Sequence, residues 1–328
     1  MVKDFKPVFI VGNPRSGTTL LATLLSRNSE LSIPSETQFM CKVLPCGTEI
    51  NTKILSHYSL VEELFTYYRI HDFEIDKDSF YCFFRNYSAT YKDMFRALLE
   101  YNAILEGKRF TGEKSPIHLL YVPLILKWYP KAKIICIVRD GRDVVQSLKK
   151  VPWGHDSLLR YCADWNYSSM LIRKYKHEYG HSVKIIQYDD LVMTPEESLK
   201  SLCDYIGISF ETEMLSTLEG SKVVAKWESG WKKKATGEID ISRLGAWRNN
   251  ASDSDLFVMN LIMKKWLKYW GYDCSYLAKV SYKMKIKKYL ESIYFRGYQY
   301  IMISRLREGV KVFLCKTGII KIYKETVR

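Results

Sequence analysis

The sequence predicts a three-layer α/β protein in which helices flank a central parallel sheet. Two observations support this prediction. Runs of Ile and Val such as Lys133–Val138 are apolar without alternation, as in strands that are buried on both faces. Each run leads through a loop into a stretch whose apolar residues are spaced three and four apart, as in a helix. Such strand–loop–helix units build parallel sheets, because each helix returns the chain to the edge where the strand began.

Four segments follow this design in order along the chain. They are Val8–Gly12 before a helix at Thr18–Asn28, Leu31–Pro34 before Ser35-Glu36-Thr37, Lys133–Val138 before a helix that runs to Lys150, and Val183–Tyr188 before a helix after Thr194. The last helix has the clearest start signal. Thr194 suits the N-cap, Pro195 suits the first helical position and Glu197 suits the third position of a capping box.

Helical spacing also appears between these units. Further helices are expected at Tyr91–Leu105, from Ser115-Pro116 to near Tyr129, at Ser157–Tyr179 and at Asp253–Tyr269. The segment Lys222–Ile241 is polar and rich in lysine, so we expect a mobile loop there.

The segment between the first strand and its helix has the frame of a phosphate-binding loop. Gly12 and Gly17 bound it and Thr18-Thr19 open the helix, as in the P-loop pattern G-x-x-x-x-G-K-[ST]. Thr18 stands where that pattern has the lysine that holds the β- and γ-phosphates of a triphosphate. Backbone amides and the helix dipole still attract an anion, and Arg15 adds a positive charge within the loop. We therefore predict a P-loop-like fold that binds a phosphate-type anion and disfavours ATP hydrolysis.

The charge of the chain is unevenly placed. The chain has 328 residues, of which 47% are hydrophobic, and a net charge of +14. Lys279–Arg328 contain 13 Lys and Arg against 3 Glu, so +10 of the total lies in these last fifty residues. We expect a main domain at residues 1–275 and a basic amphipathic, helical appendage at residues 276–328. The appendage either packs on the domain, contacts an anionic membrane peripherally or binds nucleic acid; the last is least favoured because no nucleic-acid motif is present.

The eight cysteines indicate a reducing compartment. They are scattered without a C-x-x-C motif, and Cys136, Cys162 and Cys203 lie within apolar patterns typical of buried free thiols. The first expected strand begins too near the N-terminus for a signal peptide, and no apolar run reaches the ~18 residues of a membrane span. We therefore expect a cytoplasmic protein. Because no His and Asp residues cluster, we expect no metal.

The unusual residues fall where the predicted strands end. The loop Gly12–Thr19 follows the first strand, Arg139 follows Lys133–Val138, and Tyr188 ends the last strand. Ligands of open parallel sheets bind beyond the carboxyl ends of the strands. An anion-binding loop, a cation and an aromatic ring at this edge suit a nucleotide with more than one phosphate group.

At these positions the sequence resembles the sulfotransferases that use 3′-phosphoadenosine 5′-phosphosulfate (PAPS). The likeness covers about residues 5–273 and four motifs in order, which are Pro14-Arg15-Ser16-Gly17-Thr18-Thr19-Leu20, Ile137–Ser147, Tyr188-Asp189-Asp190-Leu191 and Gly245-Ala246-Trp247-Arg248-Asn249. The resemblance implies that Pro14, Arg15, Ser16, Gly17, Thr18 and Thr19 bind the 5′-phosphosulfate. It also implies that Arg139 and Ser147 grip the 3′-phosphate, that Tyr188 lies near the adenosine, and that the segment with Trp247 and Arg248 closes over the nucleotide.

Within that family the chain is more similar to the tyrosylprotein sulfotransferases and their bacterial relatives. Glu36 follows Arg15 at the distance of that branch's catalytic glutamate, and Lys114 in Glu113-Lys114-Ser115-Pro116 matches its N-K-x-P lysine. The resemblance implies that Glu36 is the general base for an acceptor hydroxyl, and that Arg15 and Lys114 stabilise charge on the transferred group. We expect partial burial to raise the pKa of Glu36 towards neutrality, which suits a general base. We expect the acceptor to be a hydroxyl of a carbohydrate, a glycolipid or a tyrosine.

Several alternatives stay open at this point. His118 is an alternative base, although a structural role on a helix is favoured for it. Many cytosolic members have an R-K-G triplet where this chain has Asp240-Ile241-Ser242, so Arg243 or a lysine among Lys232–Lys234 has to replace that contact to the 3′-phosphate. The rival functions are a P-loop-type small-molecule kinase and a non-catalytic nucleotide-binding protein docked on a membrane surface. A kinase would need the missing loop lysine and an acid for Mg²⁺.

Overall fold

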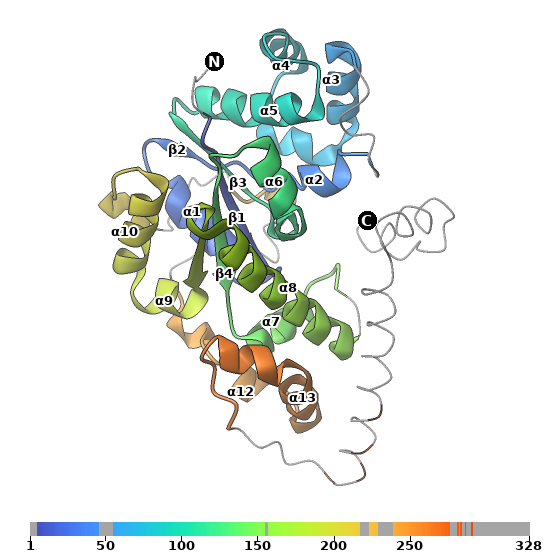
Figure 1. Ribbon diagram of the computed structural model, residues 1–328, viewed down its shortest axis with the longest axis vertical. Helices are drawn as coiled ribbons and strands as arrows, with labels where there is room; N and C mark the ends of the chain where they lie inside the picture. The colour runs from blue at the N-terminus through green and yellow to red at the C-terminus, as the bar shows by residue number, and fades with distance from the viewer. Residues whose placement is uncertain are drawn as a thin grey trace. The chain divides into compact units, whose positions relative to one another are not determined.

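A computed structural model of the chain describes residues 5–45, 55–154, 157–216, 223–228 and 239–275, together with residues 281, 283, 286 and 290 (Figure 1). The chain divides into two compact units. The first consists of Met1–Arg139 and Leu171–Ile241, and the second of Asp140–Met170 and Ser242–Arg328. Apart from those four residues, the predicted appendage at residues 276–328 lies outside the described residues, so it stays a prediction. Residues 223–228 of the predicted loop at Lys222–Ile241 are described. They include a 3₁₀-helix at Lys226–Glu228 and bury Val223 and Glu228, so this part is packed in the fold, and the mobile loop stays a prediction for the rest.

The first unit contains a five-stranded sheet with the order β2-β3-β1-β4-β5. Every neighbouring pair is parallel, which confirms the predicted fold class. The strands are β1 (Val8–Gly12), β2 (Leu31–Ser32), β3 (Phe110–Lys114), β4 (Lys133–Val138) and β5 (Val183–Gln187). All five residues of β1 are buried, as expected for a strand that is covered on both faces.

Strand β3 was not among the predicted strands. Its sequence is Phe-Thr-Gly-Glu-Lys, which has one large apolar residue and two charged ones, so it does not read as a buried strand. Glu113 and Lys114 are nevertheless fully buried. Charged groups are buried only when they are paired or hydrogen-bonded. The partners of Glu113 and Lys114 lie elsewhere in the chain, so the local sequence does not show that this strand is buried.

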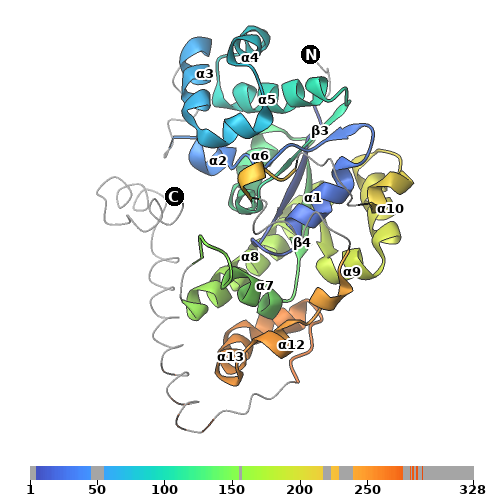
Figure 2. The ribbon, with the colours of Figure 1, turned by 180° about the vertical axis from the view of Figure 1, so that it is seen from behind.

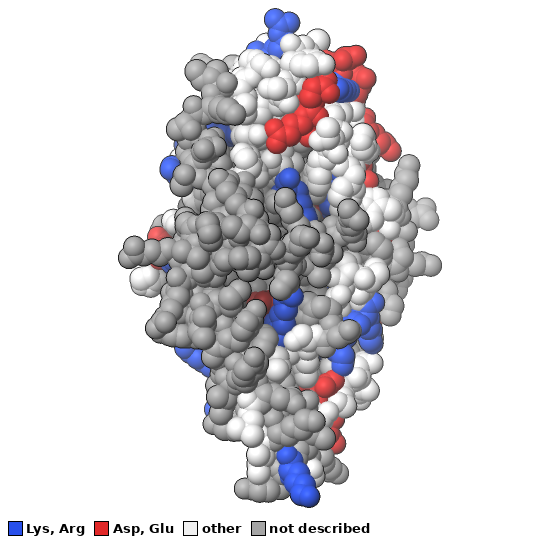
Figure 3. All heavy atoms as spheres, turned by 90° about the vertical axis from the view of Figure 1, so that its right-hand side faces the viewer, with Lys and Arg blue, Asp and Glu red and all other residues white. Residues whose placement is uncertain are grey.

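Helices cover both faces of the sheet in the first unit. Figures 1 and 2 show α1 (Thr18–Ser26) and α6 (Val122–Trp128) on opposite sides of it. The other α-helices that lie wholly in the described part of this unit are α2 (Phe39–Lys42), α3 (His57–Thr66), α4 (Lys77–Phe84), α5 (Tyr91–Leu105), α9 (Tyr188–Met193) and α10 (Pro195–Ile206). Acidic side chains gather over α3 and α4 (Figure 3), where Glu63 and Asp78 are exposed. The positive charge of the chain is therefore not spread evenly over this unit.

The predicted helices are present, although the helix predicted at Thr18–Asn28 ends at Ser26 and the one predicted to run to Lys150 ends at Leu148. The bounds of α5 are as predicted, but the segment after Ser115 begins as a 3₁₀-helix at Pro116–Tyr121 and becomes α-helical only at α6. The predicted capping box at Thr194 is wrong. The Thr194 side chain donates to the Asp190 carbonyl at 3.1 Å instead of accepting from the helix it precedes, because the short helix α9 lies between β5 and α10.

The second unit is helical in its described part. It contains α7 (Gly141–Leu148), the first half of α8 (Leu158–Tyr179), α12 (Trp247–Asn250) and α13 (Asp253–Tyr269), and the bounds of α13 are as predicted. Gly141 permits close packing at the start of α7, since a side chain there would lie 2.6 Å from the Trp165 ring and 2.9 Å from the Met263 sulfur. In the described part of the chain, no helix is long and apolar enough to cross a membrane.

Gly141→Ala should lower the free energy of unfolding by about 1–3 kcal/mol, because the added methyl group overlaps the fully buried Trp165 ring. Urea denaturation measures this loss. The control is Lys150→Ala, which removes an exposed side chain just beyond the same helix and should change the value by less than about 0.5 kcal/mol. Equal stability of Gly141→Ala and wild type would contradict the packing described for α7.

Candidate active site

The candidate site forms where the parallel strands of the first unit end. Lys114, the last residue of β3, pairs with Ile10 of β1, and Gly12 at the end of β1 pairs with Ile137 of β4. Neighbouring strands lie about 4.8 Å apart, so the segments that follow these strands begin side by side. Glu36 lies on the segment that follows β2.

The loop after β1 has the conformation of an anion-binding loop. Gly17 has a φ of 99°, which favours glycine, and immediately precedes α1 with its unpaired first-turn amides. Arg15 also has a positive φ, 72°, which is uncommon for a non-glycine residue. Among the described residues, the buried Ser16 hydroxyl has no hydrogen-bond partner. A buried hydroxyl with open hydrogen-bonding capacity beside helix amides fits a phosphate or sulfate oxygen.

Two further predicted residues lie against this loop. The Arg139 guanidinium lies over the Tyr188 ring, 4.2 Å from its centroid, and both residues are buried. The Tyr188 ring also packs against Gly17 so closely that any side chain at Gly17 would overlap it. The structure therefore brings together three predicted residues from the loop, from the end of β4 and from the end of β5.

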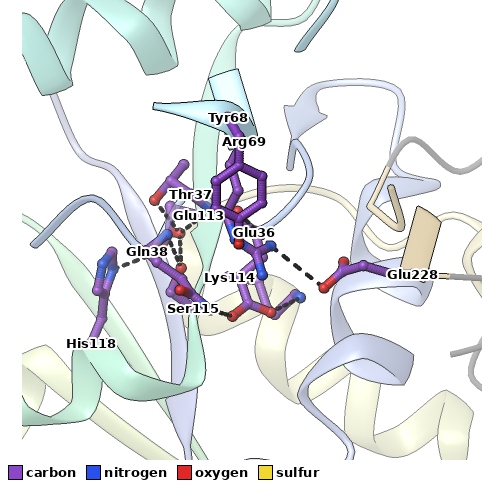
Figure 4. A network of polar contacts seen from close by, with 10 residues as sticks. All are labelled: Glu36, Thr37, Gln38, Tyr68, Arg69, Glu113, Lys114, Ser115, His118 and Glu228. Atoms are coloured by element: carbon purple, nitrogen blue, oxygen red, sulfur yellow. Dashed lines mark hydrogen bonds and ion pairs between the residues drawn. The ribbon is translucent and has the colours of Figure 1, made fainter. Parts of the chain in front are cut away.

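Glu36 and Lys114 form a buried ion pair (Figure 4). The Lys114 ammonium donates to Oε2 of Glu36 at 2.9 Å, and the side-chain amide of Gln38 donates to Oε1 of Glu36 at 2.7 Å. Lys114 is fully buried and Glu36 is 8% exposed. The ammonium favours the ionised carboxylate, which is the form that a general base needs. The predicted rise in the pKa of Glu36 stays a prediction.

Arg69 joins this cluster, although no sequence pattern predicts it. One guanidinium nitrogen of Arg69 lies 3.4 Å from the Glu36 carbonyl and 3.4 Å from a Glu228 oxygen. The guanidinium also lies over the rings of Tyr68 and Trp227. Burial lowers the pKa of Arg69, but the negative charges of Glu36 and Glu228 have the larger effect. The pKa of Arg69 is therefore raised overall, and Arg69 stays protonated. No motif marks this contact, because residues 69 and 228 are far apart in the sequence.

His118 has a structural role, as favoured from the sequence. The backbone amide of Met40 donates to Nε2 of His118 at 3.1 Å, so that nitrogen carries a lone pair and no proton. Nδ1 then bears the hydrogen and donates to Glu113 at 2.9 Å. Both ring nitrogens of the fully buried His118 are thus engaged in hydrogen bonds within the fold, which is the structural role that was favoured.

The remaining predicted residues belong to the second unit. Trp247 is fully buried, with its ring between the guanidinium groups of Arg142 and Arg248, whose centres lie 3.9 and 4.5 Å from the ring centroid. Asp140 accepts from the Trp247 indole at 3.1 Å, and Asp143 accepts from the Trp247 backbone amide at 2.8 Å. The acids of Arg139-Asp140-Gly141-Arg142-Asp143 thus hold the Gly245–Asn249 segment.

The nucleotide contacts of this unit stay predictions. Ser147 lies in the last turn of α7, and Arg243 lies at the end of a 3₁₀-helix, Ile241–Arg243. The alternative lysines Lys232–Lys234 lie outside the described residues. In the described ranges, no three His, Cys, Asp or Glu residues are arranged to hold a metal ion.

A model of the sulfotransferase family matches residues 7–212. The chain is 22% identical to a Caenorhabditis briggsae protein named "Putative protein-tyrosine sulfotransferase", over 87% of this chain and 95% of that protein. It is 26% identical to protein-tyrosine sulfotransferase 2 of Gallus gallus over 65% of this chain, and it spans about half, 54%, of that relative. Among solved structures, the sulfotransferase domain from the curacin biosynthetic pathway superposes with a TM-score of 0.58, covering 82% of this chain and 98% of that domain at 19% identity. This likeness shows the fold.

Glu113→Gln should make the stability of the protein less dependent on acid pH. Burial raises the pKa of the Glu113 carboxyl, but His118 and the hydrogen bonds from Ser115 and Thr37 outweigh it, so the pKa lies below its ordinary value. A carboxylate with a lowered pKa stabilises the folded state above the ordinary glutamate pKa, and that contribution is lost as the pH falls through the lower folded value. Wild type should exceed the variant by about 2–4 kcal/mol at neutral pH.

Urea denaturation from about pH 7 down to about pH 3.5 measures this difference. The gap between wild type and variant should narrow as the pH falls. A gap that stays constant over this range would contradict the lowered pKa of Glu113.

Proposed function

This chain belongs to the sulfotransferase family, and we propose that it transfers the sulfuryl group of PAPS to an acceptor hydroxyl with Glu36 as the general base. The observation that carries this proposal is the buried pair of Glu36 and Lys114, which lies at the strand-end edge of the sheet where the phosphate loop begins. A carboxylate and a cation at this place match the two needs of the reaction, which are proton removal from the acceptor and charge stabilisation on the donor.

The proposed step balances as a direct displacement. The acceptor oxygen attacks sulfur, its proton passes to the Glu36 carboxylate, and a new oxygen–sulfur bond forms. The bond between sulfur and the 5′-phosphate oxygen breaks, and 3′-phosphoadenosine 5′-phosphate leaves with that electron pair. Arg15 and Lys114 stabilise negative charge on the sulfuryl and bridging oxygens. Catalysis of this kind depends on positioning and electrostatic stabilisation, as in phosphoryl transfer.

The donor residues proposed in the first unit fit a nucleotide of this kind. The amides that open α1 and the Ser16 hydroxyl would bind the 5′-phosphosulfate, Arg139 the 3′-phosphate, and Tyr188 would lie by the adenosine. We propose that Ser147, Trp247 and Arg248 of the second unit complete the nucleotide contacts. No metal is needed for these contacts, because cationic side chains and amides offset the phosphate charge.

For the acceptor, we propose a tyrosine hydroxyl. Its support is the name protein-tyrosine sulfotransferase that relatives from Gallus gallus and Drosophila melanogaster carry. A carbohydrate or glycolipid hydroxyl would react by the same proton transfer to Glu36, so these acceptors are the alternatives to compare in an assay. We further propose a cytoplasmic location with peripheral contact of residues 279–328 with anionic membrane. The excess of +10 in that segment supports this contact.

Glu36→Gln should lower kcat for sulfuryl transfer by about 100- to 10,000-fold, because glutamine cannot accept the acceptor proton. Affinity for 3′-phosphoadenosine 5′-phosphate should stay unchanged, since Glu36 makes none of the proposed nucleotide contacts. A radiolabelled PAPS assay with tyrosine peptide, oligosaccharide and glycolipid acceptors measures the rate, and calorimetry measures the affinity. Wild-type activity in this variant would rule out Glu36 as the base.

The protein should bind 3′-phosphoadenosine 5′-phosphate about 10- to 100-fold more tightly than ADP without magnesium, because Arg139 adds charge-assisted hydrogen bonds to the 3′-phosphate. Arg139→Ala should remove this preference. The control is Arg109→Ala, which removes an exposed arginine elsewhere in the same unit and should keep it. Tighter, magnesium-dependent binding of ADP would favour a kinase, and nucleotide binding without transfer to any acceptor would favour a non-catalytic protein.

A further inference from the structure

The carboxylate of Glu113 takes no part in the proposed transfer, yet it is fully buried and fully engaged. Its Oε1 accepts from the Thr37 hydroxyl at 2.7 Å, the Thr37 amide at 3.3 Å and the Ser115 hydroxyl at 2.5 Å. Its Oε2 accepts from His118 at 2.9 Å (Figure 4). Burial of an ionised carboxylate is strongly unfavourable unless such donors surround it. These donors either belong to the segment that carries Glu36, as Thr37 does, or bind its backbone, as Ser115 and His118 do.

The partners of Glu113 bind the backbone of that segment, which we call the base loop, residues 36–40. Glu113 itself accepts from the Thr37 amide, and the Ser115 hydroxyl oxygen accepts from the Gln38 amide at 2.8 Å. The Thr37 hydroxyl oxygen accepts from the Phe39 amide at 3.2 Å, and His118 accepts from the Met40 amide. Four successive amides are therefore bound by Glu113 or by a side chain that donates to it.

The conformation of Gln38 shows the effect of these hydrogen bonds on the base loop. Its φ is +49°, in the left-handed region that non-glycine residues rarely adopt. Such a conformation persists where the surroundings impose it, and here Ser115 holds the Gln38 amide. In this conformation the Gln38 side chain donates to Oε1 of Glu36 at 2.7 Å. The Glu113 cluster thus fixes the backbone that places the Gln38 side chain, which hydrogen-bonds to the Glu36 carboxylate.

Strand β3 also supplies a group that binds the Glu36 carboxylate directly. Successive side chains of a strand point to opposite faces, so Glu113 and Lys114 leave β3 on different sides. Lys114 binds Oε2 of Glu36, whereas Glu113 binds the base loop. Of these two adjacent residues of β3, Lys114 therefore binds the carboxylate of Glu36, and Glu113 binds the backbone next to Glu36.

We propose that Glu113 is a positioning residue for Glu36, which acts through Thr37, Ser115 and His118 to fix the orientation of the base loop. This inference rests on the proposed role of Glu36 as the general base. Small displacements of a catalytic group lower the rate without removing the group, so the expected effect lies in kcat and not in the binding of the donor.

Glu113→Gln should lower kcat about 10- to 100-fold in the folded protein. The KM for PAPS and the Kd for 3′-phosphoadenosine 5′-phosphate should stay within about twofold of wild type, since the donor contacts are left intact. The matched control is Glu100→Gln. Glu100 is also a buried carboxylate of this unit, but it binds Arg96 and Tyr87, away from the base loop. This control should keep the wild-type kcat.

A double mutant separates positioning from general destabilisation. If Glu113 acts only through Glu36, adding Glu113→Gln to Glu36→Gln should cause no further loss of kcat. If Glu113→Gln lowers kcat by the same factor in wild type and in Glu36→Gln, the proposal is overturned. If Glu36→Gln keeps wild-type activity, the proposed function itself fails. If Glu36→Gln loses activity while Glu113→Gln keeps it, only the positioning role fails.

A milder pair of variants tests the same link if Glu113→Gln does not fold. Thr37→Val keeps the shape of Thr37 but removes the hydroxyl between Glu113 and the Phe39 amide, and Thr37→Ser keeps the hydroxyl. We expect Thr37→Val to lower kcat about 10-fold and Thr37→Ser to restore most of it, with donor affinity equal in both. Equal kcat in Thr37→Val, Thr37→Ser and wild type would overturn the proposal.

Discussion

The burial of charge at the end of β3 is the constraint on which the candidate site depends. Glu113 and Lys114 are adjacent and fully buried, so each must find partners of its own within the fold. Lys114 finds the Glu36 carboxylate, and Glu113 finds the backbone that follows it. Neither requirement can be met unless the segment after β2 crosses over the end of β3. The electrostatic needs of one strand thus determine where the proposed base lies.

The parallel sheet supplies the second part of the arrangement. Because all five strands run in one direction, their carboxyl ends open on one edge, and the residues that follow them share it. Gly17 lets the Tyr188 ring pack on the phosphate loop, and the Arg139 guanidinium lies over the same ring. Residues from three strand ends therefore support one another through contacts that no single motif contains.

The sequence predicted those parts of the fold whose signal is local. Strands rich in Ile and Val, such as β4, and helices with regular apolar spacing, such as α5, were found with the observed bounds. Strand β3 was missed because Phe-Thr-Gly-Glu-Lys has no apolar pattern, although Lys114 was found from its motif. The clamp around Glu113 and the contact between Arg69 and Glu228 were missed as well, since they join distant residues and leave no spacing to read.

The hydrogen bonds from the Gly245–Asn249 segment to Asp140 and Asp143 have a consequence for chimeric proteins. Asp140 accepts from the Trp247 indole, and Asp143 accepts from the backbone amides of Gly245 and Trp247, about a hundred residues away in the sequence. An exchange of residues 239–250 between relatives therefore transfers only one half of a matched pair. The exchanged segment keeps these hydrogen bonds only if the protein that receives it has acids at the positions of Asp140 and Asp143, so both stretches should be exchanged together.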